Sequence, residues 1–248
     1  MNPFGVPEII AGVGSPRSVL DAGCGSARLT VALAQAGADQ VIGIDTSPER
    51  LGQGRERIAA AGLAGRVSLE EADFNLSLPF EDGRFAAVTS RLALMIARDS
   101  VATLGELRRV LAAGGPIVTA LWAPPEQNLW FSLPRTAIAT VIGNEAGSYA
   151  RVFGRIGTPE EAGEAHRQAG FSAVEAHTIT EHLDVAGADE LWQWMVAENG
   201  HVRRVDAELD PGRRSAVIGE LGRLWAAHND ESGRLRLQRT MTLVTAEA

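Results

Sequence analysis

The sequence predicts an α/β fold built on a mostly parallel, seven-stranded sheet with helices on both faces and a helical cap from the C-terminal half. Short apolar strands alternate with helical segments through the first half of the chain, as they do in parallel β-α-β units. A glycine-rich turn at 23–26 directly follows the first strand, and each of the first two strands ends in an aspartate. Together these features are typical of a Rossmann-like sheet.

Local signals place each element along the chain. Residues 18–22 and 40–45 have the apolar runs of buried strands. Ser47 and Pro48 supply an N-cap and a first helical residue for a helix that extends to about Ala61. Further strands are expected at 67–70, 85–89, 117–121, 174–184 and 234–245, and further helices at 27–36, 101–112, 158–170, 188–198 and 211–228.

The composition excludes several classes of function. A net charge of −8 argues against a nucleic-acid backbone as partner, because such proteins usually carry a basic face. All 23 Lys+Arg residues are arginine, which excludes Schiff-base, pyridoxal phosphate and P-loop chemistry. The single cysteine, Cys24, cannot form an internal disulfide, and no Cys/His spacing predicts a metal. Without a secretory signal or a spanning apolar run, we expect a cytoplasmic monomer or homodimer that does not bind a membrane.

Three aspartates follow neighbouring strands of the predicted sheet. Asp21 ends the first strand, Asp45 ends the second, and Asp73 lies just beyond the third. Ligands of open parallel sheets bind outside the carboxyl ends of the strands, so these side chains should line one crevice. Asp45 lies about 20 residues after Gly23, the spacing at which a Rossmann acid accepts hydrogen bonds from ribose hydroxyls. The ligand is therefore expected to contain a ribose.

The charge of the crevice helps to choose among ribose-containing ligands. The dinucleotide fingerprint has a third glycine where this chain has Arg28, and Asp21 lies where a pyrophosphate would have to approach. A buried carboxylate repels a diphosphate but attracts a cation. A ligand with a ribose, an ammonium and a sulfonium therefore fits better than a nicotinamide dinucleotide.

The segment 19–27, Val-Leu-Asp-Ala-Gly-Cys-Gly-Ser-Ala, resembles motif I of the class I S-adenosylmethionine-dependent methyltransferases. Four later segments are similar, in the same order, to the ribose-binding strand end, the adenine-binding position, the linker before strand four and the motif before strand five of that family: 42–47, 72–74, 78–85 and 107–115. The sequence resembles most the small-molecule subgroup that includes the ubiquinone and menaquinone methyltransferases.

The resemblance implies S-adenosylmethionine as cofactor and S-adenosylhomocysteine as product. It also implies a role for each motif residue. The expected cofactor-binding residues are Asp21, Gly23, Cys24 and Gly25 at the methionine end, Asp45 at the ribose hydroxyls, and Asp73, Phe74 and Thr46 at the adenine.

Candidates for a catalytic role lie in two places. Ser90 and Arg91, just past the expected fourth strand, should face the methyl group and the acceptor, with Ser90 counted among the cofactor-binding residues. His201 follows the helix at 188–198 and is the first candidate for a general base, which is needed only if the acceptor must lose a proton. His166 and His177 are expected at the surface.

We expect a single domain in which two insertions cover the substrate. Its expected parts are a short N-terminal segment (1–16), a cofactor-binding core (17–125), substrate-cap insertions (126–156 and 184–230), and segments that complete the sheet (157–183 and 231–248).

The function expected from these features is methyl transfer from S-adenosylmethionine to an oxygen, nitrogen or carbon atom of a small molecule, in secondary metabolism. Two alternatives remain open. The protein could bind the cofactor without transferring the methyl group, as a cyclase or a binding module. It could also be a nicotinamide oxidoreductase, against which Arg28 and Asp21 count.

Overall fold

The computed structural model describes residues 4–143, 156–228 and 235–248. These residues form two compact units. The first comprises Met1–Ala123, Phe153–Ile179 and Met241–Ala248, and the second comprises Pro124–Val152 and Thr180–Thr240.

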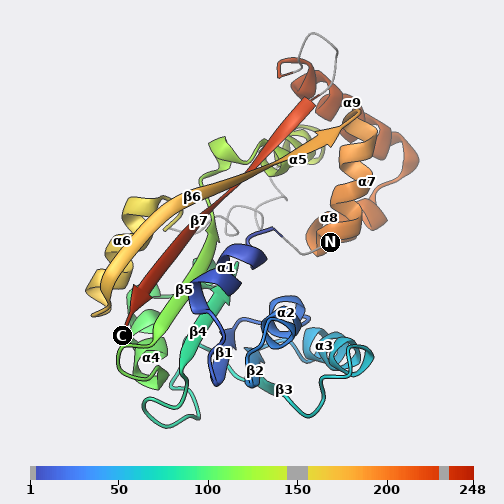
Figure 1. Cartoon of the computed structure of the whole chain (residues 1–248). Helices are drawn as coiled ribbons and strands as arrows, with labels where there is room; N and C mark the ends of the chain where they lie inside the picture. The colour runs from blue at the N-terminus through green and yellow to red at the C-terminus, as the bar shows by residue number, and fades with distance from the viewer. Residues whose placement is uncertain (1–3, 144–155, 229–234) are drawn as a thin grey trace. The chain divides into compact units, whose positions relative to one another are not determined.

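The seven strands of the sheet follow the order β3-β2-β1-β4-β5-β7-β6 (Figure 1). The strands β1 to β5 pair in parallel, and β7 runs antiparallel to β5. This order confirms the predicted mostly parallel, seven-stranded sheet. The strands are β1 (Ser18–Ala22), β2 (Gln40–Asp45), β3 (Val67–Glu71), β4 (Ala87–Arg91), β5 (Pro116–Trp122), β6 (Ser172–Val185) and β7 (Leu235–Glu247).

Helices of the first unit cover both faces of its part of the sheet (Figure 1). On one face lie α1 (Val6–Val13), α2 (Arg28–Gln35) and α3 (Pro48–Ala60), and on the other lie α4 (Ser100–Val110) and α6 (Pro159–Gln168). The helix α3 begins as the sequence predicts, because the Ser47 hydroxyl accepts the backbone N–H of Arg50 at 3.3 Å.

The prediction for strand four was displaced by two residues. The observed strand begins at Ala87, whereas the prediction began it at Phe85. Phe85 is buried and forms only an isolated bridge with Leu111, so its apolar character reflects packing in the core and not strand pairing. Ser90 and Arg91 therefore lie inside β4, at its carboxyl end.

Three helices have no counterpart in the sequence prediction: α1, α5 (Leu129–Ile142) and α8 (Gly200–Glu208). In α5, Pro134 lies inside the helix and weakens the local helical signal. The second unit also contains α7 (Ala188–Glu198) and α9 (Pro211–Ala226), and two short 3-10 turns, η1 (Leu94–Ile96) and η2 (Pro125–Gln127), complete the described elements.

The aromatic side chains of the second unit form its interior. Trp130 and Trp192 are buried, and each indole N–H has a partner. The Trp130 Nε1 donates to Asn128 Oδ1 at 2.9 Å, and the Trp192 Nε1 donates to Asp206 Oδ1 at 2.8 Å. The Arg239 guanidinium lies 5.6 Å from the Trp130 ring centroid, a cation–π distance. These aromatic residues are core residues of the second unit.

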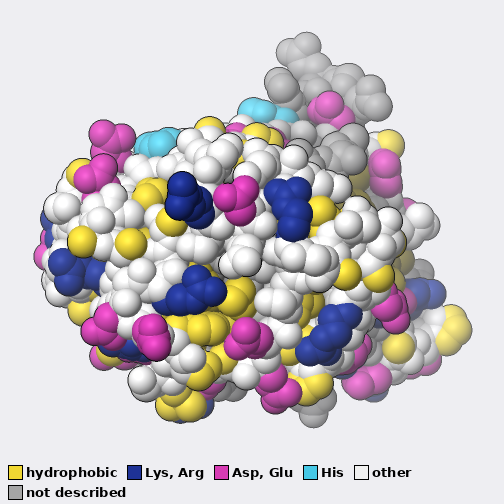
Figure 2. Space-filling view, turned by 60° about the horizontal axis from the view of Figure 1, so that its bottom comes forward, with side chains coloured by type: hydrophobic (Ala, Val, Ile, Leu, Met, Phe, Trp, Pro, Cys, Tyr) yellow, Lys and Arg dark blue, Asp and Glu magenta, His cyan; other side chains and the backbone are white. Residues whose placement is uncertain are grey.

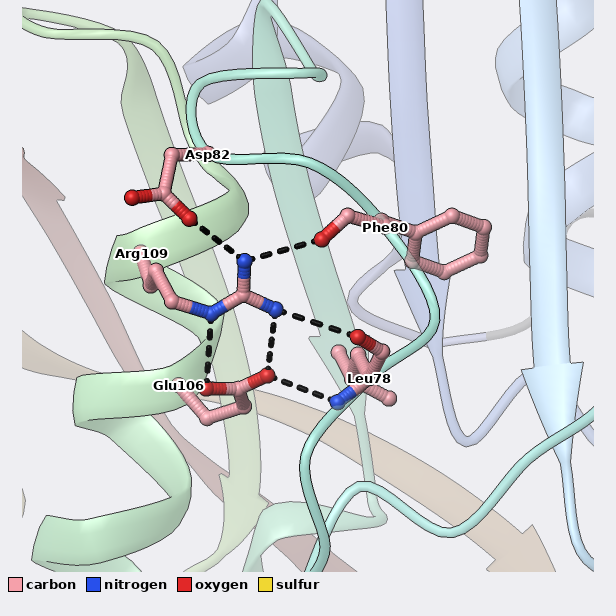
Figure 3. A network of polar contacts seen from close by, with 5 residues as sticks. All are labelled: Leu78, Phe80, Asp82, Glu106 and Arg109. Atoms are coloured by element: carbon pink, nitrogen blue, oxygen red, sulfur yellow. Dashed lines mark hydrogen bonds and ion pairs between the residues drawn. The ribbon is translucent and has the colours of Figure 1, made fainter.

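An arginine in α4 fixes the segment that leads into β4 (Figure 3). The Arg109 guanidinium donates to the backbone carbonyls of Phe80 at 2.8 Å and Leu78 at 3.1 Å. It also pairs with Glu106 at 2.6 Å and Asp82 at 2.6 Å. Glu106 in turn accepts the Leu78 backbone N–H at 2.7 Å. One side chain thus satisfies backbone groups that would otherwise need water.

The face shown in Figure 2 carries arginine side chains interspersed with acidic ones. Mixed signs of this kind are typical of a solvated surface. Among the described helices, none combines the length and the apolar character that crossing a bilayer requires.

We expect Arg109→Ala to lower the free energy of unfolding by about 2 kcal/mol, because it removes several charge-assisted hydrogen bonds from a half-buried site. The neighbouring Arg108 is exposed, so Arg108→Ala is the matched control and should cost less than about 0.5 kcal/mol. Urea denaturation of both variants measures the difference. Equal losses would show that the network does not stabilise the fold.

Candidate functional site

The carboxyl ends of β1 and β2 bring two of the predicted acids together around the glycine turn. β1 pairs in parallel with β2 on one side and β4 on the other, with Asp21 opposite Gly43 and Thr89. Asp45 ends β2, one residue beyond the pairing of β2 with β1. The side chains that follow these strands therefore gather at one edge of the sheet, as the sequence predicts.

The glycine turn is closed onto the end of β2 by backbone hydrogen bonds. The N–H groups of Gly23 and Cys24 both donate to the Ile44 carbonyl, at 2.8 and 2.9 Å. Gly23 has a φ of 74°, and a Cβ there would lie 2.1 Å from the Ala93 Cβ and 3.3 Å from the Phe74 ring. Only glycine fits this position, since both the backbone conformation and the space exclude a side chain.

Asp45 joins the turn to the start of α3. Its Oδ2 accepts the Gly25 N–H at 2.9 Å, and its Oδ1 accepts the Ser47 N–H at 2.9 Å. Each carboxylate oxygen has a second lone pair that these two bonds leave available. Thr46, next to Asp45, is exposed. The arrangement suits a vicinal diol, which offers two hydroxyl donors.

Asp21 is a buried carboxylate with a hydroxyl donor on each oxygen. Its side chain is 1% exposed. Thr30 Oγ1 donates to Oδ2 at 2.7 Å, and Thr89 Oγ1 donates to Oδ1 at 3.1 Å. Burial raises the pKa of Asp21 to about 6, although the two threonine hydroxyls and the charge of Arg91 lower it. A buried group of this kind is stabilised by a cation brought beside it.

Asp73 and Phe74 lie after β3. Asp73 Oδ1 accepts both the backbone N–H and the side-chain amide of Asn75, at 2.9 and 2.7 Å, and its Oδ2 lies 3.9 Å from Arg98. These Asn75 hydrogen bonds hold the pKa of Asp73 below its usual range. Asp73 is therefore ionised at neutral pH and fixed in orientation, with Oδ2 the less occupied oxygen. Phe74 is buried beside Gly23.

Three further predicted residues have defined partners within the first unit. Cys24 packs against Gly43, and burial with the nearby acids raises the pKa of its thiol, which disfavours a nucleophilic thiolate. The Ser90 hydroxyl is buried and donates to the Ala22 carbonyl at 3.0 Å. The Arg91 Nε donates to the Phe4 carbonyl at 2.9 Å, which ties the segment before α1 to the end of β4.

The histidine predictions have different outcomes. His201 falls within α8, but its side chain lies outside the described residues, so its role stays a prediction. The expectation that His166 lies at the surface was wrong, because its side chain is fully buried. Its Nδ1 donates to the Ala162 carbonyl at 2.7 Å, and its Nε2 lies 3.2 Å from Thr119 Oγ1. Burial lowers the pKa of His166 to about 4, so it is neutral at pH 7.

Sequence reasoning missed Thr30, Thr89 and Asn75, the residues that hold the acids in place. Thr30 lies in an apolar run, Leu29–Ala34, in which every residue is buried. A hydroxyl at such a position needs a hydrogen-bond partner, and that requirement is the signal that could have found it. Within the described ranges, no group of three or more His, Cys, Asp or Glu side chains is placed to hold a metal ion.

Residues 19–115 match the family described as a methyltransferase domain. The chain is 35% identical over 141 residues to the demethylmenaquinone methyltransferase of Thermus thermophilus, an alignment that covers 56% of this chain and 63% of that protein. It is 30% identical over 150 residues to a ubiquinone/menaquinone biosynthesis C-methyltransferase of a Geobacter species, covering 60% and 63%. The chain thus spans less than two thirds of the length of these relatives.

A solved structure shares the fold across the whole chain. Haemonchus contortus phosphoethanolamine N-methyltransferase 2, determined with phosphomonomethylethanolamine and S-adenosylhomocysteine, superposes with a TM-score of 0.62 at 18% identity, covering 99% of this chain and 54% of that one. The structural likeness shows a shared α/β fold, in which the glycine turn and the acids beside it lie at the carboxyl ends of β1 and β2. The match over residues 19–115 and the two curated relatives make this part of the chain similar to methyltransferase domains.

We expect Gly23→Ala to destabilise the protein by about 3 kcal/mol or more, since the new Cβ combines left-handed strain with a clash against Ala93. Gly62 has a similar φ of 69° with nothing within 4 Å, so Gly62→Ala isolates the strain and should cost only about 1 kcal/mol. Thermal unfolding of both variants tests the close approach. The prediction fails if the two variants have the same melting temperature.

We expect Asp21→Asn to stabilise the ligand-free protein above pH 6. The folded pKa of about 6 exceeds the ordinary 3.8, so the native state binds the extra proton and the stability contributed by Asp21 falls as pH rises through this interval. Asparagine carries no charge, and the gain at pH 8 should approach about 3 kcal/mol. Denaturant unfolding at pH 4 and pH 8 measures it, with the exposed Asp39→Asn as control. A gain that does not change with pH would contradict this origin.

Proposed function

We propose that the protein binds S-adenosylmethionine at the carboxyl edge of β1 and β2 and transfers its methyl group to a small-molecule acceptor. The observation that carries this proposal is the pair of carboxylates flanking the glycine turn, Asp21 buried and Asp45 with a free lone pair on each oxygen. A buried anion matches an ammonium group, and a bidentate acceptor matches a ribose diol. The two carboxylate acceptors therefore fit the ammonium and hydroxyl donors of this cofactor.

In this proposal the chain's residues bind and orient the cofactor. Asp45 accepts the two ribose hydroxyls, and Asp21 accepts the methionine ammonium. Asp73 accepts the adenine amino group, an assignment supported by the orientation that Asn75 imposes on the Asp73 carboxylate. Gly23 and Gly25 give the turn beside the cofactor its left-handed backbone, with φ angles of 74° and 55°.

When bound, the cofactor supplies an electrophilic methyl group on a sulfonium that is already a good leaving group. The protein's contribution is alignment of the acceptor with the methyl–sulfur bond and exclusion of water. A general base acts only where the acceptor must lose a proton. His201 is proposed for that role, and Arg91, held by its contact with the Phe4 carbonyl, is proposed to face the acceptor.

For the acceptor, we propose first the ring carbon of a hydroquinone. The names of the two curated relatives state activity on demethylmenaquinone and in ubiquinone and menaquinone biosynthesis. A hydroquinone can lose a phenolic proton, which raises electron density at the adjacent ring carbon. That carbon would form the bond to the methyl group as the methyl–sulfur bond breaks, and would then lose its own hydrogen as a proton so that the ring becomes aromatic again. This acceptor would therefore need a base, unlike an amine that attacks through its own lone pair.

Incubation of the protein with methyl-labelled S-adenosylmethionine and a reduced naphthoquinone tests the proposal. Stoichiometric S-adenosylhomocysteine and label in the ring carbon are the expected results. Amine, phenol and carboxylate acceptors in parallel reactions test the other methyl acceptors. Binding of the cofactor with no product from any acceptor would favour the non-catalytic alternative, and tight NADH binding without S-adenosylhomocysteine binding would overturn the cofactor assignment.

We expect Asp45→Ala to weaken S-adenosylhomocysteine binding about 100-fold, because two hydrogen bonds from the ribose to a charged acceptor are lost. Asp39 precedes the same strand at its opposite end and is exposed, so Asp39→Ala should leave the affinity unchanged. Calorimetric titration measures both affinities, and circular dichroism verifies that each variant is folded. An unaltered affinity in folded Asp45→Ala would refute the ribose assignment.

A further inference from the structure

The hydroxyl groups of Thr30 and Thr89 come from two different elements and meet at one carboxylate. Thr30 lies on α2 and Thr89 on β4, and both side chains are 0% exposed. They donate to opposite oxygens of Asp21, at 2.7 and 3.1 Å. Neither hydroxyl is needed to complete a helix or a strand, since the backbone supplies those hydrogen bonds.

A buried carboxylate can remain ionised only if donors replace the water it has lost. Hydrogen bonds donated to the charged form favour that form and fix its plane. We propose that Thr30 and Thr89 are positioning residues that keep the Asp21 carboxylate ionised and oriented toward the cofactor ammonium. This inference rests on the proposed cofactor-binding function and extends it to residues that would not touch the cofactor.

The hydrogen-bonding capacity of Asp21 agrees with this role. A carboxylate has about four lone-pair positions, and the two threonines use one on each oxygen. One position on each oxygen is left for an ammonium donor. The neighbouring hydroxyl, that of Ser90, donates to the Ala22 carbonyl and so does not compete for the carboxylate.

The charged groups near Asp21 affect how readily its carboxyl group ionises. Arg91 on β4 favours the ionised carboxylate, whereas Asp45 on β2 disfavours it. Cys24 in the turn is neutral, because the two acids and burial raise the pKa of its thiol. Loss of either threonine donor should therefore move the Asp21 pKa further upward, and the ligand-free carboxyl group should then hold its proton to higher pH.

Cofactor binding should follow the ionisation of Asp21. Only the ionised carboxylate attracts the ammonium, so affinity for S-adenosylhomocysteine should rise with pH and level off above pH 6 to 7, where Asp21 is ionised. 5′-Methylthioadenosine carries the adenine and ribose but no ammonium. Its affinity should not depend on this carboxylate, so it is a matched control ligand.

The experiment measures the affinities of both ligands between pH 5 and pH 8 for the wild type, Thr30→Val, Thr89→Val and Thr30→Ser. We expect each valine variant to shift the midpoint of the pH profile upward by about one unit, which weakens S-adenosylhomocysteine binding about 2-fold at pH 7 and about 10-fold at pH 5. Thr30→Ser retains the hydroxyl and should restore the wild-type midpoint. Thr119→Val removes another buried hydroxyl, in contact with His166, and should leave the midpoint unchanged.

Three outcomes would overturn one inference or the other. If the valine variants weaken both ligands equally, the threonines act only on the general structure of the site, and the positioning role is wrong. If S-adenosylhomocysteine binds with no pH midpoint, or with one that neither valine variant shifts, the positioning role is also wrong, while cofactor binding and methyl transfer still stand. If the wild type binds neither ligand, the proposed function itself fails.

Discussion

The closure of the glycine turn onto the end of β2 is the constraint on which the rest of the site depends. The Ile44 carbonyl accepts two consecutive N–H groups from the turn, and the Asp45 carboxylate accepts a third at Gly25. The same carboxylate accepts the N–H of Ser47, the residue that caps α3. The end of one strand therefore determines both the path of the turn and the start of the next helix. A ligand would meet a surface that is already formed.

This constraint is paired with an electrostatic cost at β1. Asp21 is removed from water at the centre of the sheet edge, and its burial disfavours the charge. Hydroxyl groups from α2 and β4 offset part of that cost by donating hydrogen bonds to the carboxylate. The backbone hydrogen bonds of these two elements do not themselves require a hydroxyl side chain at either position. Sites that keep an ion in a dry environment commonly trade stability for binding in this way. In this site Asp45 fixes the turn and the start of α3 through hydrogen bonds, whereas Asp21 is a buried carboxylate whose charged form is disfavoured by its burial.

The sequence was sufficient for the parts of the structure that leave a local pattern. The buried runs at 18–22 and 40–45 coincide with β1 and β2, and the Ser47-Pro48 start of α3 follows from capping chemistry alone. The strand-end position of Asp21 and Asp45 follows from the same pattern. The partners of these acids leave no such pattern, because Thr30 and Thr89 are far apart in the chain. Thr89 reaches Asp21 through the parallel pairing of β1 with β4, and Thr30 reaches it from α2.

The errors also have physical reasons. His166 has polar neighbours in sequence, Arg167 and Gln168, and its burial depends on contact between α6 and β5 through Thr119. Phe85 was assigned to strand four because it is apolar, yet its burial serves the core and not the ladder. In each case, tertiary packing overrode a local tendency.

The position of β7 has a consequence for how the chain is made. β7 lies between β5 and β6 in the sheet although both precede it in the sequence. On the ribosome, β5 emerges long before Leu235 does, and through that interval one of its edges lacks its native neighbour. Every residue of β5 after Pro116 is buried in the finished protein, so the waiting edge is strongly apolar. Exposed apolar edges pair readily with other chains. Until the last strand of the chain has emerged, this edge of β5 is therefore open to pairing with other strands.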